Sequence, residues 1–242
     1  DDSETRAKYN TEGLSVSDFR RKQVDTFIYN LKLELDEFNN RNNRFVQLGI
    51  SPTGVYKNAN SQTEANTPIE DYIFDSNGNL VYPTGATTGC QMHYESYLYC
   101  DTLKWVNNEW INYILPQTYW AQNHSLAPYE RLINWWNQAV SKKNVNLYAG
   151  MGIYMWLTNT NEAYEQLVIN DALEHVKGTS IYSYKQIAAA YNNTDVSAKE
   201  QMNDIKNYVW KNKTILPKIQ GFNEVKLGSV QNFLIDGNSI SF

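Results

Sequence analysis

The chain has 242 residues, of which 42% are hydrophobic and 14% aromatic, and its formal net charge is −5. A chain of this size buries roughly 70% of its unfolded surface, and 18 tyrosines with 7 tryptophans are far more than a disordered chain contains, so disorder as the overall state is excluded. The 21 basic residues against 26 acidic ones leave no excess charge to neutralise phosphates, so nucleic acid is not an expected partner. No apolar run approaches the ~18 residues that span a bilayer, so no membrane span is expected.

Helical and strand patterns alternate along the chain. In chain order they predict a helix at 15–38, a strand at 45–52, a helix at 94–108, a strand at 110–116, a helix at 128–140, a strand at 146–150, a helix at 162–176, a strand at 178–184 and a helix at 196–210. Ser15 is the predicted cap of the first helix, and Pro128 stands in the first turn of the third, where proline is tolerated. Strands that are separated by helices predict a parallel α/β sheet, either open or closed into an eight-stranded barrel.

A long polar stretch, residues 53–93, follows the first predicted strand. Such a stretch inside a compact domain usually serves a function. Within it, the apolar runs 72–74 and 80–82 flank an Asn-Gly step, and this pattern predicts a β-hairpin.

The sequence favours neither a cofactor nor a metal. Gly150-Met151-Gly152 lacks the third glycine of a dinucleotide-binding loop and does not follow the first strand, so a nucleotide-binding fold is not expected. No Cys/His spacing indicates zinc. Cys90 and Cys100 are too few for a disulfide framework, and free thiols are the interpretation favoured over a local disulfide.

Four segments carry motifs in the order and spacing of a known family. They are LSVSDFRRKQV at 14–24, LGISPTGVYKN at 48–58, SYLYCDTLKWV with PQTYW at 96–106 and 116–120, and LYAGMGIY with KG and YSYK at 147–154, 177–178 and 182–185. Together they resemble the bacterial glycosyl hydrolase-like family 10, whose members are (β/α)8-barrel proteins. The departures from the family pattern are mild. They are Phe19 for a tryptophan, Thr53 for a phenylalanine, Tyr56-Lys57 for Trp-Arg, and Cys100 for an alanine.

The resemblance implies an α/β fold that is the C-terminal half of a (β/α)8 TIM-type barrel, with a long hairpin-containing loop after its first strand. In the family, four βα units and an acidic strand-end motif precede the matching segment, and Asp1-Asp2 do not match that motif. We therefore expect residues 1–220 to form the second half of a glycosidase-like barrel, with about four βα units. Residues 221–242 are expected to be a β tail, with a turn at Asp236-Gly237, or the start of a following β module.

Half a parallel barrel leaves strand edges and a sheet face uncovered. The chain is therefore expected to be a fragment, or to pair with the missing N-terminal half of the barrel or with a second copy of itself.

Glycoside hydrolysis usually needs two carboxyl groups beside the scissile bond, and a barrel presents its catalytic groups at the carboxyl ends of the strands. At these places the sequence has the predicted substrate-binding residues Ser51, Tyr56, Lys57, Gln117, Tyr119, Trp120, His124, Tyr154 and Tyr184. None is a carboxylate, which suits a half-site that binds sugar while the other half supplies at least one acid. For the aromatic residues, core packing is the competing interpretation; for His124 and Lys57, it is a surface position.

Asp101 matches an acidic position of the family motif, so it is the candidate catalytic residue of this chain. Its expected place in a helix favours a competing interpretation, a structural ion pair with Arg20 or Arg21.

The resemblance implies a glycoside hydrolase that acts on a polysaccharide of the cell envelope and is extracellular or at the cell surface. Two alternatives stay open at this point: a carbohydrate-binding barrel without catalysis, and a structural surface protein. Neutral residues at the missing strand ends would favour the carbohydrate-binding barrel. A barrel top without an aromatic-lined cleft would favour the structural surface protein.

Overall fold

A computed structural model describes residues 1–95, 97–156, 161–192, 196–217, 234–236 and 239–241. Its centre is a four-stranded parallel sheet in the order β1-β4-β5-β6, which is also the order of these strands along the chain. The strands are β1 (Gly49–Ile50), β4 (Tyr113–Ile114), β5 (Asn146–Met151) and β6 (Val176–Ile181). The predicted mixture of helices with a parallel sheet is confirmed.

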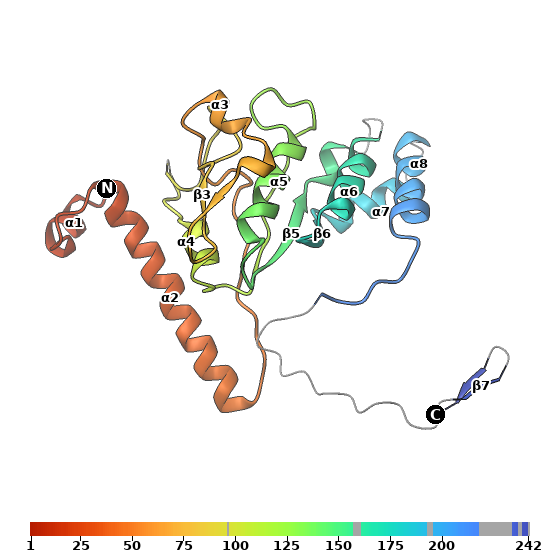
Figure 1. Cartoon of the computed structure of the whole chain (residues 1–242), viewed down its shortest axis with the longest axis horizontal. Helices are drawn as coiled ribbons and strands as arrows, with labels where there is room; N and C mark the ends of the chain where they lie inside the picture. The colour runs from red at the N-terminus through yellow and green to blue at the C-terminus, as the bar shows by residue number, and fades with distance from the viewer. Residues whose placement is uncertain (96, 157–160, 193–195, 218–233, 237–238, 242) are drawn as a thin grey trace.

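Helices precede, separate and follow these strands along the chain. They are α1 (Ser3–Tyr9), α2 (Val16–Asn42), α4 (Thr102–Asn107), α5 (Tyr129–Val140), α6 (Glu162–Ala172), α7 (Tyr184–Asn192) and α8 (Val196–Asp204), which continues as the π-helical turn η3 (Ile205–Val209). Figure 1 shows α2 at one end of the molecule and α6, α7 and α8 at the other, with the strands between them.

Helix α2 begins where the sequence predicts and ends later. The Ser15 side chain accepts a hydrogen bond from the Asp18 backbone N–H at 3.1 Å, which caps the helix. The helix continues past the predicted end at Phe38 to Asn42. It ends there because Asn43 adopts a left-handed conformation (φ 47°).

Other helices also differ from the sequence prediction. The helix predicted at 162–176 ends at Ala172, and residue 176 already belongs to β6. The predicted helix 94–108 is reduced to α4, because Tyr99 has a positive φ of 50° and Asp101 caps the helix that follows. Helix α7 was not predicted. Its start carries a cap that the sequence contains, since the Ser183 hydroxyl donates to Gln186 Oε1 at 2.6 Å.

The segment between β1 and β4 contains α3 (Gln62–Ala65), a 3-10 turn η1 (Ile69–Asp71) and the strands β2 (Ile73–Phe74) and β3 (Leu80–Tyr82). The two strands pair antiparallel at the place of the predicted hairpin. Gly78 in its turn has a φ of +74°, which favours glycine.

One buried carboxylate fixes this segment. Glu64 is 4% exposed, and its oxygens accept hydrogen bonds from the backbone N–H and side chain of Asn60 and of Thr84, at 2.6–2.9 Å. Burial opposes ionisation of Glu64, but these bonds outweigh it, so its pKa lies below the ordinary value. Glu64 therefore ties Asn60 to Thr84, two distant points of the long polar segment.

The core divides into two clusters. The larger one lies between the sheet and α5 and contains Trp105, Trp135 and Trp136, all at most 2% exposed. The smaller one joins the end of β5 to α6 and α8 around Met151 and Met202. Each large buried side chain stabilises the fold by about 1.5–3 kcal/mol.

Near the C-terminus, β7 (Leu234–Asp236) and β8 (Ser239–Ser241) pair antiparallel, with Asp236 opposite Ser239. The predicted turn residue Gly237 lies outside the described residues, as do residues 225–233. In the described part of the chain, no helix is both long and apolar enough to cross a membrane.

Candidate functional site

The carboxyl ends of the four parallel strands meet at one edge of the sheet. Backbone bridges join Gln117, just after β4, to Thr53 after β1 and to Gly150 in β5, and they keep these ends in alignment. Ser51 follows β1, Tyr119 and Trp120 follow β4, and Tyr154 lies in the turn η2 (Ile153–Met155) after β5. Most of the predicted substrate-binding residues are therefore brought to this edge.

Three tyrosines, Tyr119, Tyr154 and Tyr182, form what we call the tyrosine row. Each comes shortly after a different strand, β4, β5 and β6. The ring centres of Tyr119 and Tyr154 are 6.3 Å apart at an interplanar angle of 88°, and those of Tyr154 and Tyr182 are 6.2 Å apart at 80°. Burial, together with the neighbouring phenols, raises the pKa of Tyr119. The row is thus a continuous aromatic surface across three strand ends.

Glycines make this close arrangement of strand ends possible. A Cβ on Gly152 would lie 3.0 Å from Tyr119 Cγ and 3.2 Å from Tyr154 Cε1. A Cβ on Gly54 would lie 2.8 Å from the Trp120 ring, and one on Gly150 would lie 2.6 Å from the Pro116 carbonyl oxygen. The glycines of the Gly150-Met151-Gly152 segment therefore serve side-chain and backbone packing at the strand ends.

Gln117 is half-buried, and its amide nitrogen donates to the backbone oxygen and the hydroxyl of Ser51 at 3.2 and 3.3 Å. This contact joins the ends of β4 and β1. In the described structure the carboxamide oxygen of Gln117 has no hydrogen-bond partner, so one polar atom of this side chain is available to a ligand.

Helix α6 holds the loop that carries Tyr119 and Trp120. Glu162, 9% exposed, accepts from the Gln122 backbone N–H at 2.8 Å, and Gln166 donates to the Trp120 carbonyl oxygen at 3.0 Å. The Gln166 amide also donates to Glu162 at 2.8 Å. Sequence reasoning missed this pair; its only signal was two polar residues at i and i+4 on a buried helix face.

His124 has a local structural role in the same loop. Its Nδ1 accepts hydrogen bonds from the backbone N–H groups of Ala127 (3.0 Å) and Leu126 (3.3 Å), just before α5. These two bonds use the lone pair of Nδ1. The histidine shapes the turn, and only its Nε2 is left to face a ligand.

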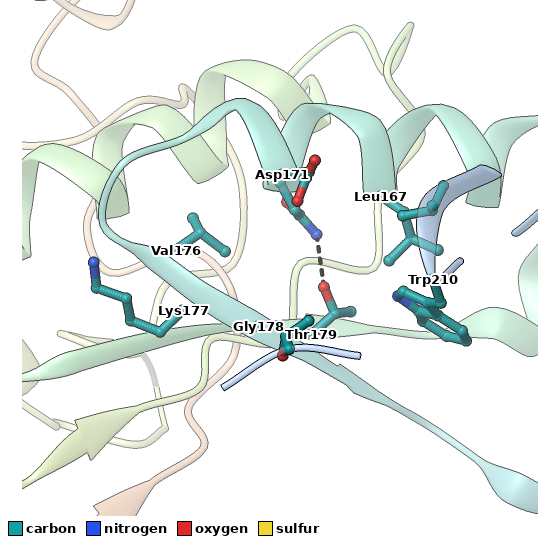
Figure 2. Close-up of a pocket in the computed structure, with 10 residues that line it drawn as sticks. Leu167, Asp171, Val176, Lys177, Gly178, Thr179 and Trp210 are labelled. Atoms are coloured by element: carbon teal, nitrogen blue, oxygen red, sulfur yellow. Dashed lines mark hydrogen bonds between the residues drawn. The ribbon is translucent and has the colours of Figure 1, made fainter. Parts of the chain in front are cut away.

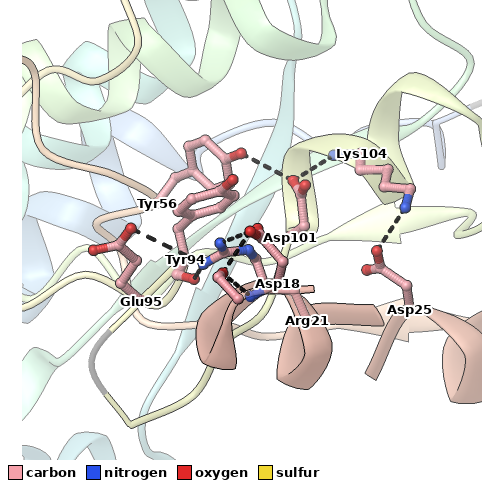
Figure 3. Close-up of polar contacts among 9 residues, drawn as sticks. Asp18, Arg21, Asp25, Tyr56, Tyr94, Glu95, Asp101 and Lys104 are labelled. Carbon is pink, nitrogen blue, oxygen red and sulfur yellow. Dashed lines mark hydrogen bonds and ion pairs between the residues drawn. The ribbon is translucent and has the colours of Figure 1, made fainter. Parts of the chain in front are cut away.

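Asp101 does not form the predicted ion pair with Arg20 or Arg21. Figure 3 shows instead that it caps α4, accepting from the Lys104 backbone N–H at 3.1 Å and from the Tyr56 hydroxyl at 2.9 Å. Burial raises the pKa of Asp101, although these hydrogen bonds act in the opposite direction. This geometry gives Asp101 a positioning role in the fold.

Tyr56, predicted to bind substrate, is 8% exposed and belongs to the core. Its ring stacks on Trp135, with centres 5.6 Å apart and an interplanar angle of 16°. Burial, and then the adjacent Asp101 carboxylate, raise the pKa of Tyr56. Tyr56 follows β1 along the chain, but its ring packs inward against Trp135.

The two arginines have other partners. Arg20 donates to Asp2 at 2.7 and 2.8 Å, and Arg21 donates to Asp18 at 2.6 Å. The guanidinium of Arg21 lies 4.2 Å from the centre of the Tyr94 ring, and the ammonium of Lys57 lies 4.9 Å from the same centre. Lys57 is thus held by an aromatic ring.

Among the remaining predicted residues, Tyr184 is 80% exposed at the start of α7, and Trp120 is half-buried against the core. Cys90 and Cys100 are free thiols, and burial raises the pKa of both. His93 is buried and hydrogen-bonds Thr102 at 2.7 Å; burial lowers its pKa to about 4. No cluster of metal-ligating side chains occurs in the described ranges.

A separate pocket of about 280 Å³ lies beside the amino-terminal half of β6. Figure 2 shows Trp210 at one end and Lys177 at the other, with Asp171 on the helix above them. The hydrogen bond from Asn170 to Thr179, 3.1 Å long, crosses it. None of the predicted substrate-binding residues lines this pocket.

Comparison with known proteins shows to which family the chain belongs. The family model described as Glycosyl hydrolase-like 10 matches residues 2–169. The chain belongs to the Glycosyl hydrolase-like 10 family. This confirms the resemblance that the four sequence motifs indicate.

Two relatives carry glycosyl hydrolase names. Glycosyl hydrolase YngK of Bacillus subtilis (strain 168) is 29% identical over 188 residues, which are 74% of this chain and 32% of the relative. Glycosyl hydrolase DigH of Escherichia coli (strain K12) is 28% identical over 194 residues, 75% of this chain and 38% of the relative. This member of the Glycosyl hydrolase-like 10 family therefore spans about a third of the length of the relatives.

Proposed function

We propose that the chain is one part of a glycoside hydrolase domain that acts on a polysaccharide of the cell envelope, outside the cell or at its surface. The observation that carries the proposal is the aromatic and amide surface at the strand ends, formed by the tyrosine row with Gln117 beside it. Aromatic rings stack on the C–H faces of sugars, and neutral amides and hydroxyls bond their hydroxyl groups.

The proposal includes the half-barrel architecture. Four parallel strands in sequential order, with helices between them, are the arrangement of consecutive βα units. In the described sheet, β1 and β6 each have one neighbour, so both edges are free to pair with further strands. The matching strands would come from the missing N-terminal half of the barrel or from a second copy, with residues 1–220 as the domain and 221–242 as a β tail or the start of a following β module.

At least one catalytic carboxylate would come from outside this chain. None of the predicted strand-end residues is a carboxylate, and Asp101 is committed to α4 and Tyr56. The absence of a carboxylate among the predicted strand-end residues also favours a second candidate function, a barrel that binds glycan without cleaving it. The two candidates share the binding surface and differ in what the partner strands supply.

The test uses the 242-residue chain and a panel of envelope and plant polysaccharides, with binding followed by affinity electrophoresis and cleavage by the release of reducing ends. We expect retardation by at least one polysaccharide and no release of reducing ends. Release by the chain alone would contradict the division of the site between this chain and a partner. Absence of binding to the whole panel would contradict the proposed function and leave a structural role.

A further inference from the structure

The pocket of Figure 2 is formed wholly by residues of this chain and is separate from the strand ends. Its volume is about 280 Å³, and its walls are α6, the amino-terminal half of β6, and Val209, Trp210 and Thr214. Apart from Leu167, its residues lie beyond the range 2–169 that the family model matches. The proposed function does not use this pocket, and its volume suits a small ligand.

One end of the pocket carries a cation, and an irregularity of the sheet places it there. The register between β5 and β6 shifts, so that Lys177 has no residue opposite it, whereas its neighbours Val176 and Gly178 do. Such bulges redirect a side chain and are common beside binding sites. The Lys177 ammonium donates to the Glu174 carbonyl oxygen at 2.8 Å, which leaves two of its three hydrogens for a ligand.

Further positive groups lie beyond this end. A neighbouring pocket of about 310 Å³ shares Lys177 and is also lined by Lys143 and His175. The Glu174 carboxylate lies 3.9 Å from the His175 ring, but its side chain is 85% exposed, so solvent weakens its effect. The Lys177 end of the pocket therefore favours an anionic group.

A buried chain of hydrogen bonds orients the hydroxyl in the middle of the pocket. The Tyr129 hydroxyl donates to Asn170 Oδ1 at 2.8 Å, and the Asn170 amide donates to Thr179 Oγ1 at 3.1 Å. Tyr129 and Asn170 are 0% and 4% exposed, so groups that water does not reach fix the direction of this chain. Because Thr179 Oγ1 accepts from Asn170, its own proton is directed elsewhere and can bond an acceptor of a ligand.

The rest of the pocket supplies a carboxylate and an aromatic ring. Asp171 is exposed on α6, and among the described residues no basic side chain pairs with it. Trp210 follows the π-helical turn η3, which is closed by the bond from its backbone N–H to the Ile205 oxygen at 2.9 Å, and it is 45% exposed. Single π-turns at helix ends are frequent at functional sites. Leu167 and Val209 make this end of the pocket apolar.

The order of these groups along the pocket identifies the ligand class. Figure 2 shows Lys177 at one end, Asp171 and Thr179 in the middle, and Trp210 at the other end. A free amino acid carries the complementary groups in the same order, which are a carboxylate, an ammonium and a side chain. We propose that this pocket binds a zwitterionic aromatic amino acid, with its carboxylate on Lys177 and Thr179, its ammonium on Asp171 and its ring on Trp210. This inference does not rest on the proposed function.

The experiment follows the indole N–H signals of the isotope-labelled 242-residue chain by NMR during titration with L-phenylalanine. The Trp210 signal is assigned from its absence in Trp210→Leu. We expect a saturable shift of this signal with a Kd of about 1 mM, the affinity typical of a ligand of this size. L-phenylalanine amide lacks the carboxylate and N-acetyl-L-phenylalanine lacks the ammonium, so each should bind about tenfold more weakly.

Charge variants separate recognition from a structural role. Lys177→Gln should weaken binding of L-phenylalanine about tenfold and leave binding of the amide unchanged, because the amide has no carboxylate. Asp171→Asn should weaken binding of L-phenylalanine by a similar factor and leave binding of the N-acetyl derivative unchanged. The controls are Lys199→Gln on the exposed side of α8 and Tyr208→Leu in η3, which lie outside the pocket and should retain the full affinity.

Two results with the unchanged chain would overturn the amino-acid site. One is the absence of a saturable shift at about 20 mM L-phenylalanine, well above the expected Kd. The other is equal affinity for L-phenylalanine, its amide and its N-acetyl derivative. A shift of the Trp210 signal by N-acetylglucosamine but not by L-phenylalanine would also overturn it, and would indicate a sugar site. These comparisons decide even if circular dichroism shows that a variant is misfolded, and binding of the polysaccharide panel is a separate result.

Discussion

Two regions of this molecule contain the residues that the sequence singles out, and the fold uses them in opposite ways. In the cluster of Figure 3, Tyr56 and Asp101 are turned inward and hydrogen-bonded to each other. In the tyrosine row, the rings contact one another only edge to face, and their hydroxyls have no partner in the described structure. Residues of the same type and a similar strand-end position therefore become structural in one region and ligand-accessible in the other.

The difference follows from what lies beyond each strand. After β1, a long segment folds back over the strand end and covers Tyr56, and its conformation is fixed by Glu64. After β5 and β6, the chain turns into η2 and α7, and among the residues that the structure describes Tyr154 and Tyr182 stay 49% and 61% exposed. A covering loop supplies hydrogen-bond partners and excludes water.

The largest expected effect concerns the attachment of α2 to the covered region. Asp25 is 6% exposed and accepts from the Trp105 indole N–H at 2.6 Å and from the Lys104 ammonium at 2.7 Å. Asp25→Ala leaves that buried indole N–H unpaired, so we expect the free energy of unfolding in urea to fall by about 3 kcal/mol. The control Asp36→Ala removes an exposed ion pair with Lys32 and should cost less than about 1 kcal/mol. Equal losses in the two variants would contradict the distinction.

The pH dependence of stability distinguishes two carboxyl groups in the covered region. Glu64 has a pKa below its ordinary value of 4.5, so its stabilisation is present above that value and is lost as the pH falls toward the lowered pKa. Asp101 has a pKa above its ordinary value of 3.8, so stability decreases as the pH rises from that value through the raised pKa.

Unfolding in urea between pH 3 and pH 7 measures both groups. Glu64→Gln should cost about 2 kcal/mol at pH 7, because two donors then face an amide NH2, and should remove part of the loss of stability in acid. Asp101→Asn keeps a good helix cap and should change the slope in the opposite sense. If the two variants changed the pH dependence of the free energy of unfolding in the same direction, the pKa direction given for Glu64 or for Asp101 would be wrong.

A smaller effect is expected at the open region, where a glycine sets the ring positions. Gly152→Ala introduces a Cβ about as close to the Tyr119 and Tyr154 rings as contacts allow, so the row must shift. We expect a loss of stability of about 1 kcal/mol and a several-fold loss of glycan affinity. Gly178→Ala is the matched control, because its Cβ would lie 3.4 Å from the Tyr148 ring in ordinary contact. If both alanine variants bound glycan like the unchanged chain, ring placement would not govern binding.

The parts of the fold that could be predicted are those set by residues close together in the sequence. The Ser15 cap, the antiparallel pair β2 and β3, and the alternation of helices with strands follow from side-chain spacing that acts within a few residues. The helix predicted at 94–108 failed because Tyr99 takes a left-handed conformation, which apolar periodicity does not reveal. Helix α7 was missed although its Ser183–Gln186 cap is visible in the sequence, because the strand pattern before it was extended too far.

The strand-end positions of the candidate site residues were predictable from the sequence, whereas the burial of their side chains was not. By itself the sequence determined the family and the parallel α/β character, because motifs and periodicity are local properties of the chain. Only the tertiary structure decided that Tyr56 faces the core and Tyr182 the solvent. That choice depends on which distant segment covers each strand end, and contacts between residues 56 and 101 or 154 and 182 are not encoded in the spacing of either residue alone.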